Sequence, residues 1–82
     1  MSNLCSRTCS CGGQSYTITY PCTGWINGGA EMCRQFCKLA TERAIDLPTP
    51  GVAVAARIGG VNVVLTRGTQ GPSANVFRTL MQ

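Results

Sequence analysis

Cysteine is the residue type in this sequence with the most chemistry to offer. The chain has 82 residues and no histidine, and its six cysteines are Cys5, Cys9, Cys11, Cys22, Cys33 and Cys37. Thiols at this density form structural disulfides, bind a metal ion or carry out redox chemistry. Which of these applies depends on the elements that position them.

The spacing of four of the cysteines favours disulfides. Cys33 and Cys37 are four residues apart, so on a helix they share one face and do not bridge each other comfortably. Cys9 and Cys11 form a C-x-C pair, so on an extended segment they point to the same side. We therefore expect the C-x-C pair to bridge to the C-x-x-x-C pair, although six cysteines allow other connectivities.

The two remaining cysteines, Cys5 and Cys22, would then bridge each other. The rival use is a zinc site made by Cys5, Cys9, Cys11 and Cys22, whose spacing differs from the paired C-x-x-C knuckles of structural zinc sites. A redox enzyme would need the C-x-x-C motif, which the sequence lacks. We expect disulfides, no metal and no cofactor, and we keep a small zinc-binding protein as the less favoured hypothesis.

A C-x-C strand combined with a C-x-x-x-C helix resembles the cysteine-stabilised α/β motif of defensins and scorpion-toxin-like peptides. The resemblance covers residues 9–37. The order differs, because in that motif the helix comes first and the strand follows. The resemblance implies a secreted host-defence or toxin-like peptide, and the net charge of +4 is in keeping with it.

Hydrophobic patterning predicts the first two elements. Residues 15–20 alternate strictly between aromatic or branched residues and small polar ones, which is typical of a strand. Residues 30–45 carry apolar side chains at three- and four-residue spacing, which predicts an amphipathic helix that includes two of the cysteines.

The second half of the chain predicts a hairpin and a short helix. Residues 52–67 are expected to fold back at Gly59-Gly60, so that three pairs face each other: Ile58 with Val61, Ala56 with Val63, and Val54 with Leu65. Ser73 can cap a C-terminal helix over residues 74–81. The expected fold is one small disulfide-stapled α+β domain over residues 1–82, with an antiparallel sheet, a main helix and a cysteine-rich arm at residues 1–14.

Composition excludes several classes of function. The basic residues are scattered and no two of them are adjacent, which argues against a nucleic-acid interface. The three acids lie on or beside one helix, and no histidine can serve as a base, so we do not expect an enzyme. No stretch approaches the ~20 apolar residues of a membrane span.

Low charge predicts a chain that associates with itself. Charged residues make up 12% of the sequence, against about 25% in typical domains, which suits a subunit whose faces are covered by neighbours. The nearly uncharged segment 61–66 is expected to present a strand edge, and the short helix needs a surface to dock on. The interaction candidates are Val61, Val63, Val64, Leu65, Val76, Phe77, Leu80 and Met81.

The residues before Cys5 lack the basic start and apolar run of a secretory signal. We therefore expect a chain made without a recognisable signal peptide and oxidised in an extracellular location or on a particle surface. The leading hypothesis is a self-assembling structural subunit of an extracellular filament, appendage or virion. The alternative is a monomeric, disulfide-rich secreted binding or antimicrobial peptide.

Overall fold

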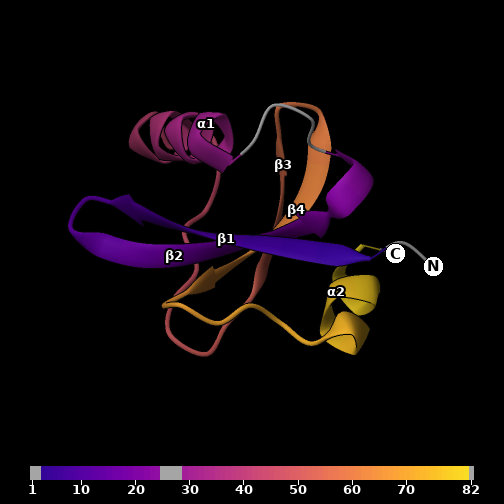
Figure 1. The fold of residues 1–82 in the computed structure, drawn as a ribbon. Coiled ribbons are helices and arrows are strands. Elements are labelled where there is room, and N and C mark those ends of the chain that lie inside the picture. Colours follow the sequence, from indigo (N-terminus) through magenta and orange to yellow (C-terminus); the bar gives the residue numbers. More distant parts are fainter. Residues whose placement is uncertain (1–2, 25–28, 82) are drawn as a thin grey trace.

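The computed structural model describes residues 3–24 and 29–81 (Figure 1). The prediction of a small disulfide-stapled α+β domain is confirmed. Its elements in chain order are β1 (Leu4–Cys11), β2 (Gln14–Pro21), the 3-10 turn η1 (Cys22–Gly24), α1 (Gly29–Thr41), β3 (Val54–Ile58), β4 (Val61–Arg67) and α2 (Ala74–Leu80).

The strands form one antiparallel sheet in the order β1-β2-β4-β3. It is built from two hairpins, and each turns on two glycines with positive φ, Gly12-Gly13 and Gly59-Gly60. Such residues suit a two-residue turn, because glycine adopts positive φ without steric cost. The register of the second hairpin is the predicted one, with Ile58 opposite Val61, Ala56 opposite Val63 and Val54 opposite Leu65.

The helix α1 covers one face of the sheet and closes the core. Its Met32 and Phe36 are fully buried, and the Phe36 ring meets the ring of Tyr16 on β2 edge-to-face with centroids 5.4 Å apart. The sheet side of this core consists of Cys9, Tyr16, Ile18, Ile58, Val63 and Leu65. Alternation along each strand puts all six on the same face.

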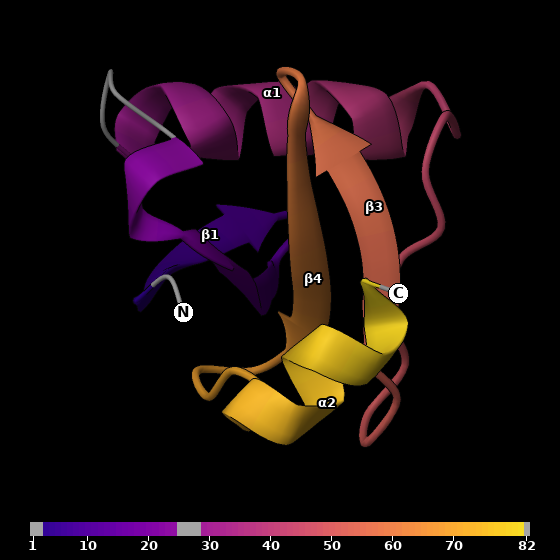
Figure 2. The same cartoon turned by 90° about the vertical axis from the view of Figure 1, so that its right-hand side faces the viewer.

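The short helix α2 lies on the opposite face. Figure 2 shows β3 and β4 passing in front of α1, with α2 in front of both strands. Ser73 caps the helix as predicted, since its hydroxyl accepts a hydrogen bond from the Val76 amide at 3.3 Å. Phe77 is buried on this side, as is Val64, which points away from α1. The two helices therefore enclose the sheet between them.

Two boundaries differ from the prediction. Residues 1–14 were expected to be an arm, but Leu4–Cys11 is a full strand that forms a hairpin with β2. The main helix was expected to reach residue 45, but it ends at Thr41. The cause is Arg43, which has a positive φ of 58° and so turns the chain out of the helix.

In the described part of the chain, no helix is long and apolar enough to cross a membrane.

Candidate self-association surface

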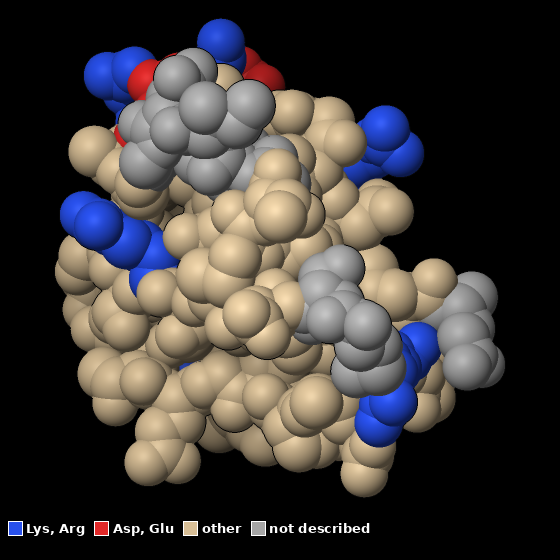
Figure 3. Space-filling model, turned by 45° about the vertical axis from the view of Figure 1, so that its right-hand side comes forward, with Lys and Arg blue, Asp and Glu red and all other residues tan. Residues whose placement is uncertain are grey.

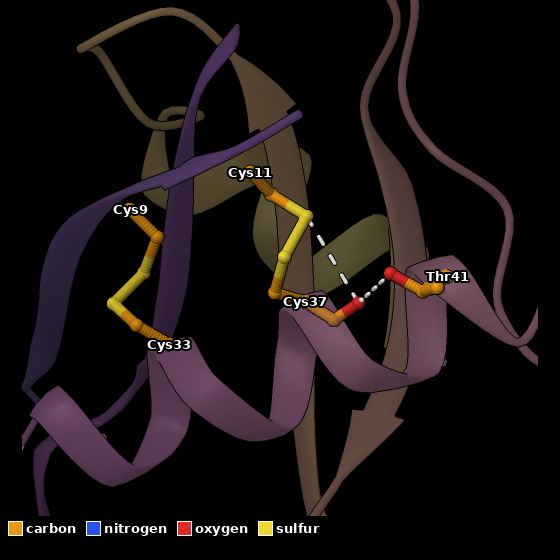
Figure 4. The surroundings of a disulfide bond; sticks show 5 residues. All are labelled: Cys9, Cys11, Cys33, Cys37 and Thr41. Atoms are coloured by element: carbon orange, nitrogen blue, oxygen red, sulfur yellow. Dashed lines mark hydrogen bonds between the residues drawn. A yellow bond between two sulfur atoms is a disulfide. The ribbon is translucent and has the colours of Figure 1, made fainter. Parts of the chain in front are cut away.

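All three disulfides begin on β1. Cys5 bridges to Cys22, Cys9 to Cys33 and Cys11 to Cys37, with Cα–Cα distances of 5.0, 5.5 and 5.5 Å. The first bridge joins β1 to η1, and the other two join β1 to one face of α1 (Figure 4). The expected pairing of the C-x-C strand with the C-x-x-x-C helix is thus confirmed.

The same pairing accounts for the four cysteines that the alternative zinc site would use. The four cysteines proposed for it are distributed over three different bridges, and no cysteine is free. Among the described residues, no group of three or more metal-ligating side chains comes together. Three disulfides are compatible with an oxidising environment.

The bridges to α1 are supported at the helix end. The hydroxyl of Thr41 donates a hydrogen bond to the Cys37 carbonyl oxygen at 2.8 Å. The sulfur of Cys11 lies 3.9 Å from the same oxygen (Figure 4), but a disulfide sulfur carries no proton, so this is a contact and not a hydrogen bond. β1 is therefore fixed along its length by covalent bonds to α1 and η1 as well as by its ladder with β2.

In the part of the chain that the structure describes, one edge of β1 has no neighbouring strand and is called the open edge below. The β1–β2 ladder runs without a bulge from Leu4 opposite Pro21 to Cys11 opposite Gln14. In a two-residue hairpin the residues flanking the turn form a hydrogen-bonded pair, and hydrogen-bonded and non-hydrogen-bonded pairs then alternate. The bond from the Cys22 amide to the Asn3 carbonyl oxygen, 3.0 Å long, fits this alternation at the far end.

This alternation decides which backbone groups face outward. Odd-numbered residues of β1 direct their amide and carbonyl groups to β2. The residues that direct theirs to the open edge are Leu4, Ser6, Thr8 and Ser10. Three of these, Ser6, Thr8 and Ser10, are exposed and carry small side chains that leave room for another strand.

The open edge of β1 lacks the usual protection against pairing. Natural edge strands are guarded by proline, bulges, charges or short length. β1 has eight residues, no proline and a single charge, Arg7. A side chain at Gly29 would overlap the Arg7 side chain, so Arg7 lies against the first residue of α1, although it remains exposed.

The other open edge, that of β3, is better protected. β3 has five residues, and its pairing with β4 leaves only Ala55 and Arg57 with outward backbone groups. Arg57 borders a hollow of about 620 Å³ between α1 and the β3–β4 turn, which also contains Glu31, Arg34, Lys38 and Glu42. Charged side chains of both signs therefore lie near the end of this edge that leads into the turn.

The predicted edge in residues 61–66 is corrected by the structure. β4 is an inner strand that pairs with β3 on one side and β2 on the other. Val63, Val64 and Leu65 are fully buried within the chain and Val61 is half-buried, so a partner cannot reach the first three in the folded state. The segment is nearly uncharged because it is the centre of this sheet.

The interaction candidates on and next to α2 differ in how exposed they are. Phe77 docks on the sheet and is 7% exposed, whereas Val76 is 43% exposed. Leu80 and Met81 are half-buried at the margin of the contact. Val76 and Leu80 border a mainly apolar hollow of about 440 Å³ that also includes Val52, but nothing in the structure shows what covers it.

The open edge of β1 was not predicted from the sequence. In the segment Leu4–Cys11 the residues with outward backbone groups alternate with three cysteines and Arg7. Neither face therefore has the apolar alternation that usually marks a strand. The available signal was the Gly12-Gly13 pair ahead of the predicted strand at residues 15–20. Two glycines at that position mark a two-residue hairpin turn, and the residues before them would then form the partner strand.

Comparison with protein-family models, curated proteins and solved structures found no match. The chain's own geometry is therefore the basis for the function proposed below.

Proposed function

We propose that this chain is a structural subunit that associates with copies of itself outside the reducing cytosol. An extracellular filament, an appendage or a virion is the kind of assembly that fits. The observation that carries the proposal is the open edge of β1. Four of its residues direct backbone groups outward, and the strand has no proline, no bulge and a single charge.

The surface supports the same proposal. With 12% charged residues, the molecule has little of the electrostatic repulsion that keeps small domains apart. On the face shown in Figure 3 the charged side chains stand toward the margins, and the described residues between them are uncharged. A neighbouring copy that contacts this face would therefore bury few charges, and burial of an unpaired charge is costly.

The disulfides link association to the oxidising compartment. Each bridge closes a loop of 17 to 26 residues, and closure of such a loop contributes about 3 kcal/mol to stability. All three end on β1, so the edge strand gains most from oxidation. A reduced chain would hold β1 only by its ladder with β2, and its edge would be less well ordered for pairing.

Sedimentation velocity of the oxidised protein over about 10 μM to 1 mM tests this proposal. These concentrations span the affinities of weak to moderate interfaces. We expect species heavier than the 8.7 kDa chain to increase with concentration and to persist at about 1 M salt, since backbone pairing does not depend on ion pairs. Reduction should diminish them. A single 8.7 kDa species throughout would contradict the proposal.

A monomeric, disulfide-rich secreted binding or antimicrobial peptide is the second candidate. The observation that favours it is that all six cysteines pair within the chain, which leaves no thiol for a covalent link between copies. The monomeric outcome of the sedimentation experiment would support this candidate directly.

A further inference from the structure

We infer that two copies pair through their β1 edges, antiparallel and around a two-fold axis at Thr8, to form one continuous sheet. This inference rests on the proposed function, because it names the partner and the register of the self-association described above. The partner is a second copy of this chain, and the steps below derive the register from the backbone and the charges of β1.

The direction of the pairing follows from symmetry. A strand and its copy related by a two-fold axis perpendicular to the sheet run antiparallel and keep the same face on the same side. The α1 layers of both copies then lie on one face of the joined sheet. The contact is self-complementary, so β1 needs no second kind of surface to bind.

The outward backbone groups limit the register. The outward residues of one copy, Leu4, Ser6, Thr8 and Ser10, must lie opposite outward residues of the other so that amides meet carbonyls. Only registers that match even-numbered residues with even-numbered residues satisfy this condition. Two of them overlap most of the strand, one centred on Arg7 and one centred on Thr8.

Charge selects between the two. In the Arg7-centred register, the two Arg7 residues lie directly opposite each other at a close non-hydrogen-bonded pair, and like charges in that position destabilise a sheet. In the Thr8-centred register, Arg7 lies opposite Cys9, Ser6 lies opposite Ser10 and Thr8 lies opposite its own copy. A Thr–Thr pair such as this one is favourable across strands.

The covalent anchoring of β1 adds to the fit. Cys9 and Cys11 are tied to α1 and Cys5 to η1, so the strand is held in its extended form before a partner arrives. A partner therefore has little chain entropy to remove, which is the usual benefit of a preorganised edge.

Proline at position 8 tests the inference, with proline at position 55 as the matched control. The amide of Thr8 points to the open edge and not to β2, so Thr8→Pro spares the internal ladder, and Ala55→Pro does the same on β3. Thr8→Pro removes both donors at the axis and should weaken self-association at least about 10-fold. Ala55→Pro should associate like the unmodified protein.

The outcomes separate the inference from the proposed function. If the unmodified protein associates and Thr8→Pro associates equally well, or if only Ala55→Pro is impaired, the inference is wrong while self-association stands. If the unmodified protein stays monomeric, both fail. Intact mass and circular dichroism must show that each variant keeps its three disulfides and its fold.

A second variant covers the case in which Thr8→Pro fails to fold. Thr8→Lys keeps the backbone amide but places two ammonium groups opposite each other at the axis. We expect its self-association to fall at low ionic strength and to recover at about 1 M salt, where exposed charges are screened. Association of Thr8→Lys equal to that of the unmodified protein at low salt would overturn the Thr8 register.

Discussion

At the scale of single residues, two threonines on β2 occupy similar positions and differ in one hydrogen bond. Thr17 and Thr19 are 1% and 4% exposed and share the face of the sheet away from α1. The Thr17 hydroxyl donates to the Gly68 carbonyl oxygen at 2.8 Å. Among the described residues, the Thr19 hydroxyl is a buried group without a partner, and it lies against the backbone of Gly71.

Substituting valine for each of these threonines should change the free energy of unfolding in opposite directions. Valine keeps the shape of threonine and removes the hydroxyl. Thr19→Val should raise the free energy of unfolding by about 1 kcal/mol, because a buried hydroxyl without a hydrogen bond is costly. Thr17→Val should lower it by about 1 kcal/mol, because it removes a satisfied bond.

Denaturant unfolding of the oxidised protein, at a concentration where it is monomeric, measures both changes. The account of this face would be contradicted if Thr19→Val destabilised the fold as much as Thr17→Val. It would also be contradicted if both changes were neutral.

At the scale of elements, the end of α1 depends on a residue in an unfavourable conformation. The Ala44 amide bonds to the Leu39 carbonyl at 2.9 Å, and the Arg43 amide bonds to the Ala40 carbonyl at 3.1 Å. These two bonds are the Schellman arrangement, whose left-handed position is usually glycine. Here it is Arg43, with φ of 58°, and a left-handed conformation costs a residue with a Cβ about 1 kcal/mol or more.

Glycine at this position should therefore stabilise the protein. Arg43→Gly is expected to raise the free energy of unfolding by about 1 kcal/mol, reduced somewhat by the greater freedom of glycine in the unfolded chain. Arg43→Lys, which keeps the charge and the Cβ, should be neutral and serves as the control. Thermal or denaturant unfolding measures both, and equal stability of the glycine and lysine variants would show that the turn is not strained.

Local signals explain which elements could be predicted from the sequence. The Gly59-Gly60 pair fixes a two-residue turn, and that turn fixes the register of the flanking strands, so the β3–β4 pairs were predicted correctly. The cysteine spacing likewise places two bridges between a strand and a helix face. The end of α1 could not be predicted, because an arginine carries no signal for a left-handed cap.

Strand order is not a local property. This is why the sequence predicts an exposed edge at residues 61–66, which belong to an inner strand in the structure. A nearly uncharged strand such as Val61–Arg67 suits either a partner-binding edge or the centre of the chain's own sheet. Only the pairing of Tyr16–Thr19 with Val64–Arg67 distinguishes the two, and those segments are far apart in sequence. The open edge lies instead on β1. The residues of β1 that direct backbone groups to this edge are mostly polar, so hydrophobic patterning does not reveal the strand.

At the scale of the whole molecule, the edge strand β1 carries one end of every disulfide and also makes the proposed contact. All three bridges end on β1, so reduction would release this strand from both α1 and η1, and β1 is also the strand with an unguarded edge. A two-fold contact through this edge closes at a dimer. A filament, appendage or virion would therefore need a second contact that β1 does not supply.

Amide hydrogen exchange at β1, measured as a function of protein concentration, tests the central claim most directly. In dilute protein the odd-numbered amides should be protected by β2, whereas Ser6, Thr8 and Ser10 should exchange freely. At concentrations where association occurs, we predict slower exchange at Ser6, Thr8 and Ser10 and no change at Ala55 and Arg57. Association without any slowing at these three amides, or with slowing on β3 instead, would contradict the claim that the open edge of β1 joins the copies.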